Sequence, residues 1–201
     1  MNIAVLASGN GTNLQALIDA EKRGELAGAK IVLALSDNSG AFALKRAKEA
    51  GIETFVLETK GFSSREEYDK KIIEQLEKAK VELVILAGFM RILSDHFVDK
   101  YHGRMMNIHP ALLPSFKGVY GIKDAFDRGV KVSGVTVHFV DRELDAGPVI
   151  LQEAVKVEEN DTEESLEEEI HKIEHRLYPE AVRLFVQARL RIEGKKVKIS
   201  K

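Results

Sequence analysis

The sequence predicts an α/β protein, with a doubly wound, mostly parallel sheet in its N-terminal half and a mixed, antiparallel extension in its C-terminal half. Short apolar runs alternate with amphipathic stretches over the first hundred residues. Residues 83–87 form a continuous apolar run, as expected of a central parallel strand covered on both faces. After about residue 104 longer strand-like runs take over, so a single domain over 1–201 is expected, with halves at 1–103 and 104–201.

The N-terminal half contains four predicted strands and three predicted helices. The strands fall at residues 3–7, 31–35, 54–57 and 83–87. The first helix begins near Thr12, and the second covers residues 41–50 and ends at Gly51. Ser63 and Ser64, with two glutamates behind them, form a capping-box signal that predicts the start of the third helix.

The C-terminal half begins with a strand at residues 105–108 that runs into Pro110. Residues 132–140 and 149–157 predict two strands joined by a loop that contains Gly147 and Pro148. A long helix follows, opened by Asp161 or Thr162 and rich in glutamate where the helix dipole favours anions. Residues 191–199 predict a terminal hairpin.

The composition excludes several classes of function. The 201 residues include no cysteine, which rules out disulfides, thiolate catalysis and cysteine-ligated metals. A net charge of −2 gives no basic field for nucleic acid. No signal peptide or membrane span is evident, so a cytoplasmic protein is expected. His171 and His175 have metal-ligand spacing without a third ligand, so no metal is expected; a monomer and a homodimer both stay open.

A glycine loop follows the first strand, as Ser8-Gly9-Asn10-Gly11-Thr12-Asn13-Leu14. Glycines allow a sharp turn, and the free N–H groups of a helix start form an anion site. The loop lacks the third glycine of a dinucleotide fingerprint and the ending of a P-loop, which favours a single phosphate on a small substrate. The alternative is a plain strand-to-helix turn capped by Thr12 or Asn13.

Asn107 and His109 lie two apart at the end of a strand, so their side chains share a face. An amide and a charged imidazole together can stabilise an oxyanion. Asp145, in a shaped loop between two strands, is the best candidate to hold the imidazole and accept a proton. With no serine or cysteine nucleophile nearby, this trio predicts direct acyl transfer. The alternative is that His109 only caps a strand and Asp145 is a solvated loop acid. A structural role is expected for His138.

Four motifs resemble the phosphoribosylglycinamide formyltransferase family, one of the folate-dependent formyltransferases. They stand at residues 8–14, 87–93, 107–110 and 144–150, in the family's order and over nearly the whole chain. The resemblance implies formyl transfer from 10-formyltetrahydrofolate to 5-phosphoribosylglycinamide in purine biosynthesis. It implies that Asn107, His109 and Asp145 are catalytic.

The resemblance also assigns the binding positions. For the ribonucleotide they are Gly11, Thr12, Asn13 and Glu174. For the folate they are Arg65, Met90, Arg91, Ile92, Leu93, Asn107, Asp141, Arg142, Glu143, Leu144 and Asp145. From the residues alone, Ile92 and Leu93 would be ordinary core. Ala111 and Tyr120 depart from residues that the family often carries, which leaves the details of that loop open.

Two alternatives remain open at this point. A formyltetrahydrofolate hydrolase would use Asp145 to activate water, but such enzymes carry a regulatory segment ahead of the core. Formyl transfer to tRNA is disfavoured because no basic C-terminal domain is visible. A nucleotide-binding oxidoreductase would use the glycine loop with Asp37 as its ribose-binding acid, although the fingerprint is incomplete.

Overall fold

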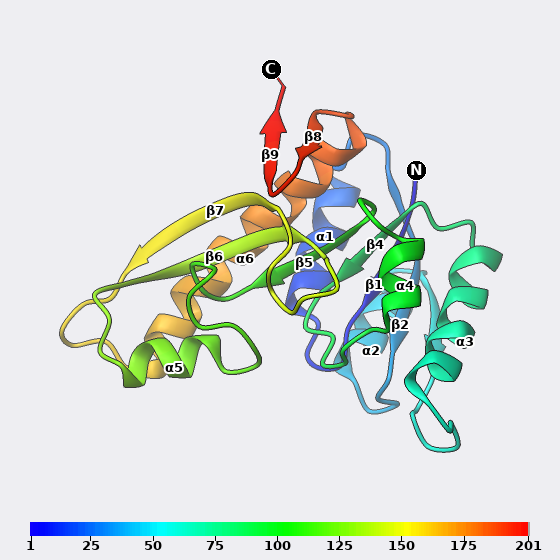
Figure 1. The fold of residues 1–201 in the computed structure, drawn as a ribbon, viewed down its shortest axis with the longest axis horizontal. Coiled ribbons are helices and arrows are strands. Elements are labelled where there is room, and N and C mark those ends of the chain that lie inside the picture. Colours follow the sequence, from blue (N-terminus) through cyan, green and yellow to red (C-terminus); the bar gives the residue numbers. More distant parts are fainter. Residues whose placement is uncertain (201) are drawn as a thin grey trace.

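A computed structural model describes residues 1–200 as a nine-stranded sheet with helices on both faces (Figure 1). The strand order is β3-β2-β1-β4-β5-β6-β7-β9-β8. The strands are β1 (Asn2–Leu6), β2 (Lys30–Ser36), β3 (Glu53–Val56), β4 (Leu83–Leu86), β5 (Met105–His109), β6 (Val132–Phe139), β7 (Val149–Lys156), β8 (Leu190–Glu193) and β9 (Lys196–Ile199). The helices are α1 (Thr12–Lys22), α2 (Phe42–Glu49), α3 (Arg65–Lys78), α4 (Asp95–Lys100), α5 (Gly121–Asp127) and α6 (Glu163–Val186).

Strands β1 to β5 are all parallel, and β6 and β7 continue the sheet in antiparallel pairing. The predicted fold class is therefore confirmed. The change of direction falls between β5 and β6, so the strand that carries Asn107 still belongs to the parallel part. Helices α4 and α5 were not predicted; with six and seven residues they are too short for a helical period to show.

Alternate residues of each central strand pack against different helices. In β1, Ile3 and Val5 face a core layer formed with α1, α2 and α6. Their neighbours Ala4 and Leu6 face the opposite layer, which α3 and α4 complete. Since both faces are covered, the strands read as continuous apolar runs in the sequence.

The predicted helix-start signals act as caps. The Ser64 hydroxyl accepts a hydrogen bond from the Glu67 N–H at 3.1 Å. Thr162 and Ser165 form a reciprocal capping box that opens α6, so Thr162 is the residue that begins this helix. Within residues 1–200, no helix combines the length and apolar character that a bilayer crossing needs.

The sheet order places a ligand site at the carboxyl ends of its central strands. The chain proceeds from β1 outward to β3 on one side, then returns to β4 and β5 on the other. Ligands of doubly wound sheets bind where the strand order reverses in this way. The glycine loop follows β1, and Asn107 and His109 end β5, so the topology brings both predicted motifs to one edge.

Gly147 explains the shape of the loop behind Asp145. A Cβ at this position would lie 1.9 Å from the Phe139 carbonyl oxygen, so the backbone approach requires glycine. We predict that Gly147→Ala lowers the free energy of unfolding by about 1–3 kcal/mol in urea titrations. The control is Gly40→Ala, where the added Cβ meets one side-chain atom at 3.4 Å. An equal effect of both substitutions would contradict this explanation.

Candidate active site

A cleft of about 420 Å³ opens at the carboxyl ends of β1, β4 and β5. Its wall combines three loops that follow these strands with one face of α6 and two loops of the C-terminal half. The lining residues are Gly9–Asn13, Ala87–Ile92, Asn107–Pro110, Gly118, Val119, Leu144, Asp145, His171 and Glu174. The predicted catalytic trio and the predicted phosphate loop therefore share one cavity.

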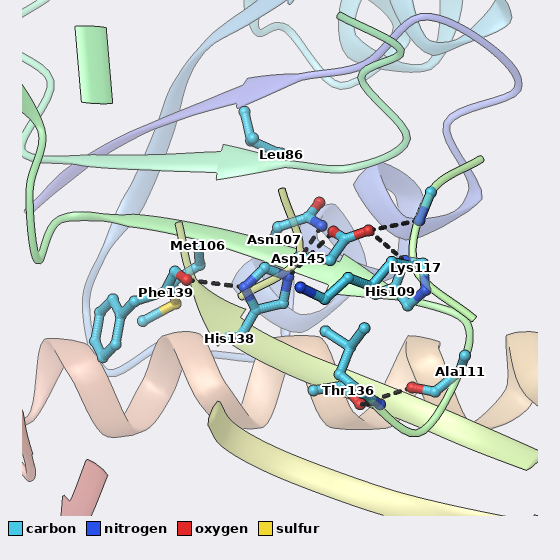
Figure 2. Close-up of polar contacts among 12 residues, drawn as sticks. Leu86, Met106, Asn107, His109, Ala111, Lys117, Thr136, His138, Phe139 and Asp145 are labelled. Carbon is cyan, nitrogen blue, oxygen red and sulfur yellow. Dashed lines mark hydrogen bonds and ion pairs between the residues drawn. The ribbon is translucent and has the colours of Figure 1, made fainter. Parts of the chain in front are cut away.

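Asn107 lies directly opposite His138 in the antiparallel pairing of β5 with β6. The Nδ1 of His138 is 2.8 Å from the Phe139 carbonyl oxygen, so this nitrogen carries the proton and donates. The Nε2 of His138 then accepts from the Asn107 amide NH₂ at 3.2 Å (Figure 2). This contact orients the amide and leaves the second NH₂ hydrogen for a ligand.

Burial keeps the His138 ring neutral. Loss of hydration lowers its pKa below the ordinary value of 6.5, against the opposing effects of the Phe139 carbonyl and the Asp145 carboxylate. The His138 ring is buried, which is compatible with the structural role expected for it, and its neighbours Asn107 and Asp145 belong to the candidate catalytic trio.

His109 is held from both sides. Its Nε2 donates to the Phe116 carbonyl oxygen at 2.7 Å, and its Nδ1 lies 3.6 Å from the Asp145 carboxylate. The side chain is 5% exposed, so the ring has little freedom to turn. Because both ring nitrogens face oxygen atoms, a doubly protonated ring has an acceptor on each side. His109 is thus a buried side chain next to the Asp145 carboxylate, which disfavours the alternative that it only caps a strand.

Asp145 is the centre of the polar contacts in the cleft. One carboxylate oxygen accepts from the Gly118 N–H at 2.8 Å, and the other lies 3.7 Å from His138 Nε2. The backbone of Asp145 has φ of 50°, in the left-handed region that non-glycine residues rarely adopt. Such backbone strain concentrates at functional sites, where surrounding contacts maintain it. The position of the buried carboxylate is therefore fixed both by its hydrogen bond from Gly118 and by the backbone conformation of Asp145.

The trio provides the groups that acyl transfer to an amine requires. An amide NH₂ and an imidazole can donate to the oxygen of a carbonyl under attack, and a carboxylate beside them can accept a proton. Figure 2 shows Asn107 and His109 on β5 close to Asp145, with His138 beside Asn107 and Asp145. Within the described residues, the cleft is lined by no serine, cysteine or lysine that could act as a nucleophile.

The glycine loop has the geometry of an anion site. Gly11 has φ of 72°, and a Cβ there would lie 2.6 Å from the Cβ of Ala43, so only glycine fits. Within residues 1–200 no side chain caps the start of α1, which disfavours the plain turn capped by Thr12 or Asn13. The first N–H groups of α1 are thus left for a ligand in the cleft.

Glu174 reaches this loop from α6. Its buried carboxylate accepts from the Asn13 side-chain amide at 2.9 Å and from His171 Nδ1 at 2.8 Å. The hydrogen bond to Glu174 raises the pKa of His171 above 6.5. His171 was not predicted as a site residue, yet it lines the cleft beside Glu174, which stabilises its charged form.

The predicted folate positions divide into two groups. Met90, Arg91, Ile92 and Leu144 line the cleft together with the trio. Ile92 is 58% exposed, whereas Leu93 is buried in the layer with α3 and α4, so the ordinary-core alternative describes Leu93 alone. The other predicted folate positions lie outside the cleft lining. Arg65, at the start of α3, and Asp141 are both exposed. Arg142 forms an ion pair with Asp99, and Glu143 forms one with Lys117.

The two departures from the family pattern have different surroundings. Ala111 is fully buried, and its carbonyl oxygen accepts from the Thr136 hydroxyl at 2.6 Å. Tyr120 is 68% exposed and does not line the cleft. Among residues 1–200, neither Ala111 nor Tyr120 shares a hydrogen bond or ion pair with the trio.

The environments of the histidines predict distinct titrations. In a ¹H–¹⁵N NMR titration, His138 should titrate below 6.5 as the Nδ1–H tautomer, because burial disfavours its charged form. His171 should titrate above 6.5, because Glu174 stabilises its charged form. Assignments come from His138→Gln and His171→Gln. A reversed order of the two titrations would contradict this electrostatic description.

Comparison with known proteins identifies the family. Residues 1–182 match the formyl transferase family. Phosphoribosylglycinamide formyltransferase of Escherichia coli is 45% identical over 96% of this chain and 90% of its own length. The Bacillus subtilis enzyme of the same name is 42% identical, over 90% of this chain and 92% of that relative.

Larger proteins and solved structures match as well. The trifunctional purine biosynthetic protein adenosine-3 of Gallus gallus is 47% identical over 96% of this chain, which spans only 19% of that relative. In the Chironomus tentans counterpart the chain spans 14%. A structure of glycinamide ribonucleotide transformylase 1 from Symbiobacterium toebii superposes with a TM-score of 0.97 at 43% identity, covering 100% of this chain and 94% of that one. With this fold, this cleft and these matches, the chain belongs to the formyl transferase family.

Proposed function

We propose that this chain transfers a formyl group from 10-formyltetrahydrofolate to the amine of 5-phosphoribosylglycinamide, a step of purine biosynthesis. The observation that supports the proposal is one cleft lined both by Asn107, His109 and Asp145 and by the glycine loop at residues 9–13. The family implies a folate-derived cosubstrate, and family membership sets aside the oxidoreductase alternative. Asp37, the ribose-binding acid of that alternative, does not line the cleft.

In the proposed reaction the substrate amine attacks the formyl carbon directly. The second Asn107 NH₂ hydrogen and the protonated His109 Nδ1 donate to the oxyanion that develops there. The Asp145 carboxylate stabilises the charged His109 and accepts the proton that leaves the amine, directly or through a water. Collapse of the tetrahedral intermediate breaks the bond from the formyl carbon to the folate nitrogen, and this nitrogen takes up the proton held by Asp145 as tetrahydrofolate leaves. The neutral His138 keeps the Asn107 amide turned toward the reacting oxygen.

The phosphate end of the acceptor binds at Gly11, Thr12 and Asn13 in this proposal. Helix N–H groups favour an anion, and the charged His171 adds to that attraction. The Glu174 carboxylate, fixed by Asn13 and His171, is placed to accept hydrogen bonds from ribose hydroxyls. In this arrangement the glycine loop holds the phosphate of the acceptor, and the amine of the acceptor reaches the trio.

The folate end uses the apolar rim of the cleft. Met90, Ile92, Val119 and Leu144 are all more than half exposed and line the cavity. A flat pterin fits an apolar slot with polar groups at its edge, and Arg91 is within reach of such an edge. Folate binding also stays a prediction for five further residues, which are Arg65, Leu93, Asp141, Arg142 and Glu143. A reaction without a metal, a cytoplasmic location and a monomeric or homodimeric state are likewise predictions from the sequence.

Substitution of Asp145 tests the proposed chemistry. Asp145→Asn keeps the size of the side chain but removes the charge that stabilises the imidazolium, so kcat should fall by about 10²- to 10⁴-fold. Folate binding, measured by fluorescence titration, should stay within severalfold of wild type. The exposed Asp127→Asn serves as a control. Turnover close to wild type in Asp145→Asn would sink the assigned role.

The pH dependence of acceptor binding tests His171. As pH rises through its raised pKa, the ring loses its charge, and KM for the phosphorylated amine should rise about two- to fivefold, a modest effect because the ring is partly exposed. In His171→Lys the KM should stay flat between about pH 7 and 8.5, since lysine keeps its charge there. The same rise in wild type and His171→Lys would show that another group titrates.

The activity itself is tested by a formyl-transfer assay with and without the acceptor amine. We expect tetrahydrofolate to form only when 5-phosphoribosylglycinamide is present, with one formylated product for each folate consumed. Formate release that does not depend on the amine would instead identify a hydrolase.

A further inference from the structure

We propose that Arg46 is a positioning residue that holds the glycine loop in the shape that binds the acceptor's phosphate. This inference rests on the proposed function. Arg46 belongs to α2, which lies beside α1 (Figure 1), and it is not part of the cleft lining. Its side chain reaches the loop from outside the cleft.

All three guanidinium nitrogens of Arg46 are used. Nε donates to the Asn10 carbonyl oxygen at 2.9 Å, and one terminal nitrogen donates to the Asn10 side-chain oxygen at 3.2 Å. The other terminal nitrogen donates to the Gln15 side-chain oxygen at 3.3 Å. Gln15 is itself oriented by Asp19, to which its amide donates at 2.9 Å. One planar group thus joins the loop to the first turn of α1.

The neighbouring contacts show that α2 shapes this loop. The Ala43 N–H donates to the Gly9 carbonyl oxygen at 3.1 Å, and the Gly11 backbone packs against Ala43 so closely that no side chain fits. Gly9 and Gly11 are therefore each fixed by Ala43, and Arg46 fixes Asn10 between them. Three consecutive residues of the cleft wall are set by one helix.

The guanidinium itself is positioned by Phe42. Its carbon lies 4.8 Å from the centre of the Phe42 ring, and Lys45 lies over the same ring at 5.2 Å. Stacking on an aromatic face and forked donation are properties of arginine that lysine does not reproduce. The side chain therefore supplies geometry, and a lysine substitution separates that geometry from the positive charge.

The experiment compares acceptors with and without the phosphate. Steady-state kinetics are measured for wild type, Arg46→Ala, Arg46→Lys and Lys45→Ala with 5-phosphoribosylglycinamide and with its unphosphorylated riboside. For Arg46→Ala we expect KM for the phosphorylated acceptor to rise about tenfold, as for the loss of charge-assisted hydrogen bonds. The kcat/KM for the riboside should change less than about twofold. Lys45→Ala loses a 3.9 Å surface ion pair with Glu49 and a contact over the Phe42 ring but no hydrogen bond to the glycine loop, so it should match wild type.

The outcomes are distinct. Equal losses with both acceptors, or no loss with either, overturn the inference. Arg46→Lys should lose phosphate discrimination as well; full recovery by lysine would show that charge alone matters and would overturn the positioning role. If Arg46→Ala does not fold at the assay temperature, Arg46→Lys carries the same comparison.

A binding measurement separates this inference from the proposed function. Calorimetry with ribose 5-phosphate and ribose needs no folate and no turnover. Wild type should bind ribose 5-phosphate more tightly than ribose, and Arg46→Ala should reduce that preference about tenfold. If wild type transfers no formyl group but this contrast holds, only the proposed function fails. If wild type is active and Arg46→Ala keeps the preference, only the inference fails.

Discussion

The buried carboxylate of Asp145 is the constraint on which the rest of the site depends. A carboxylate that is 8% exposed needs partners, because a buried charge without them is costly. The fold supplies the Gly118 N–H and the His109 imidazole, while the neutral His138 ring lies 3.7 Å from the other carboxylate oxygen. To reach them, Asp145 adopts a left-handed backbone, and Gly147 allows the following loop to pass directly over the Phe139 carbonyl. The buried charge of Asp145 therefore depends on the shape of the loop that carries it.

The change of strand direction at β5 gives the site its second imidazole. Antiparallel β6 brings His138 level with Asn107 near the carboxyl end of β5. The Phe139 carbonyl fixes which nitrogen of His138 carries the proton, and the other nitrogen then orients the Asn107 amide. At the far end of the cleft, α6 brings Glu174 and His171 to the glycine loop. One sheet edge thus collects groups from residues 9 to 174.

Local signals predicted most of the fold and the centre of the site. Period-two spacing placed Asn107 and His109 on one face, and the capping signal at Asp161 or Thr162 predicted where α6 begins. The contacts that depend on register were not predictable. His138 lies opposite Asn107 because of the β5–β6 pairing. The pairing of β6 with β7 shifts register between Val137 and His138. Arg46 contacts Asn10 across 36 residues, and no periodicity reports such a contact.

The central claim is that Asn107, His109 and Asp145 surround the formyl group during transfer. The most direct measurement is a crystal structure with 5-phosphoribosylglycinamide and an unreactive analogue of the formyl folate. We expect the formyl oxygen to lie within hydrogen-bond distance of the Asn107 amide nitrogen and His109 Nδ1. The acceptor amine should lie about 3–3.5 Å from the formyl carbon, on the side of Asp145. A formyl group bound away from this trio, with both ligands otherwise in the cleft, would contradict the account.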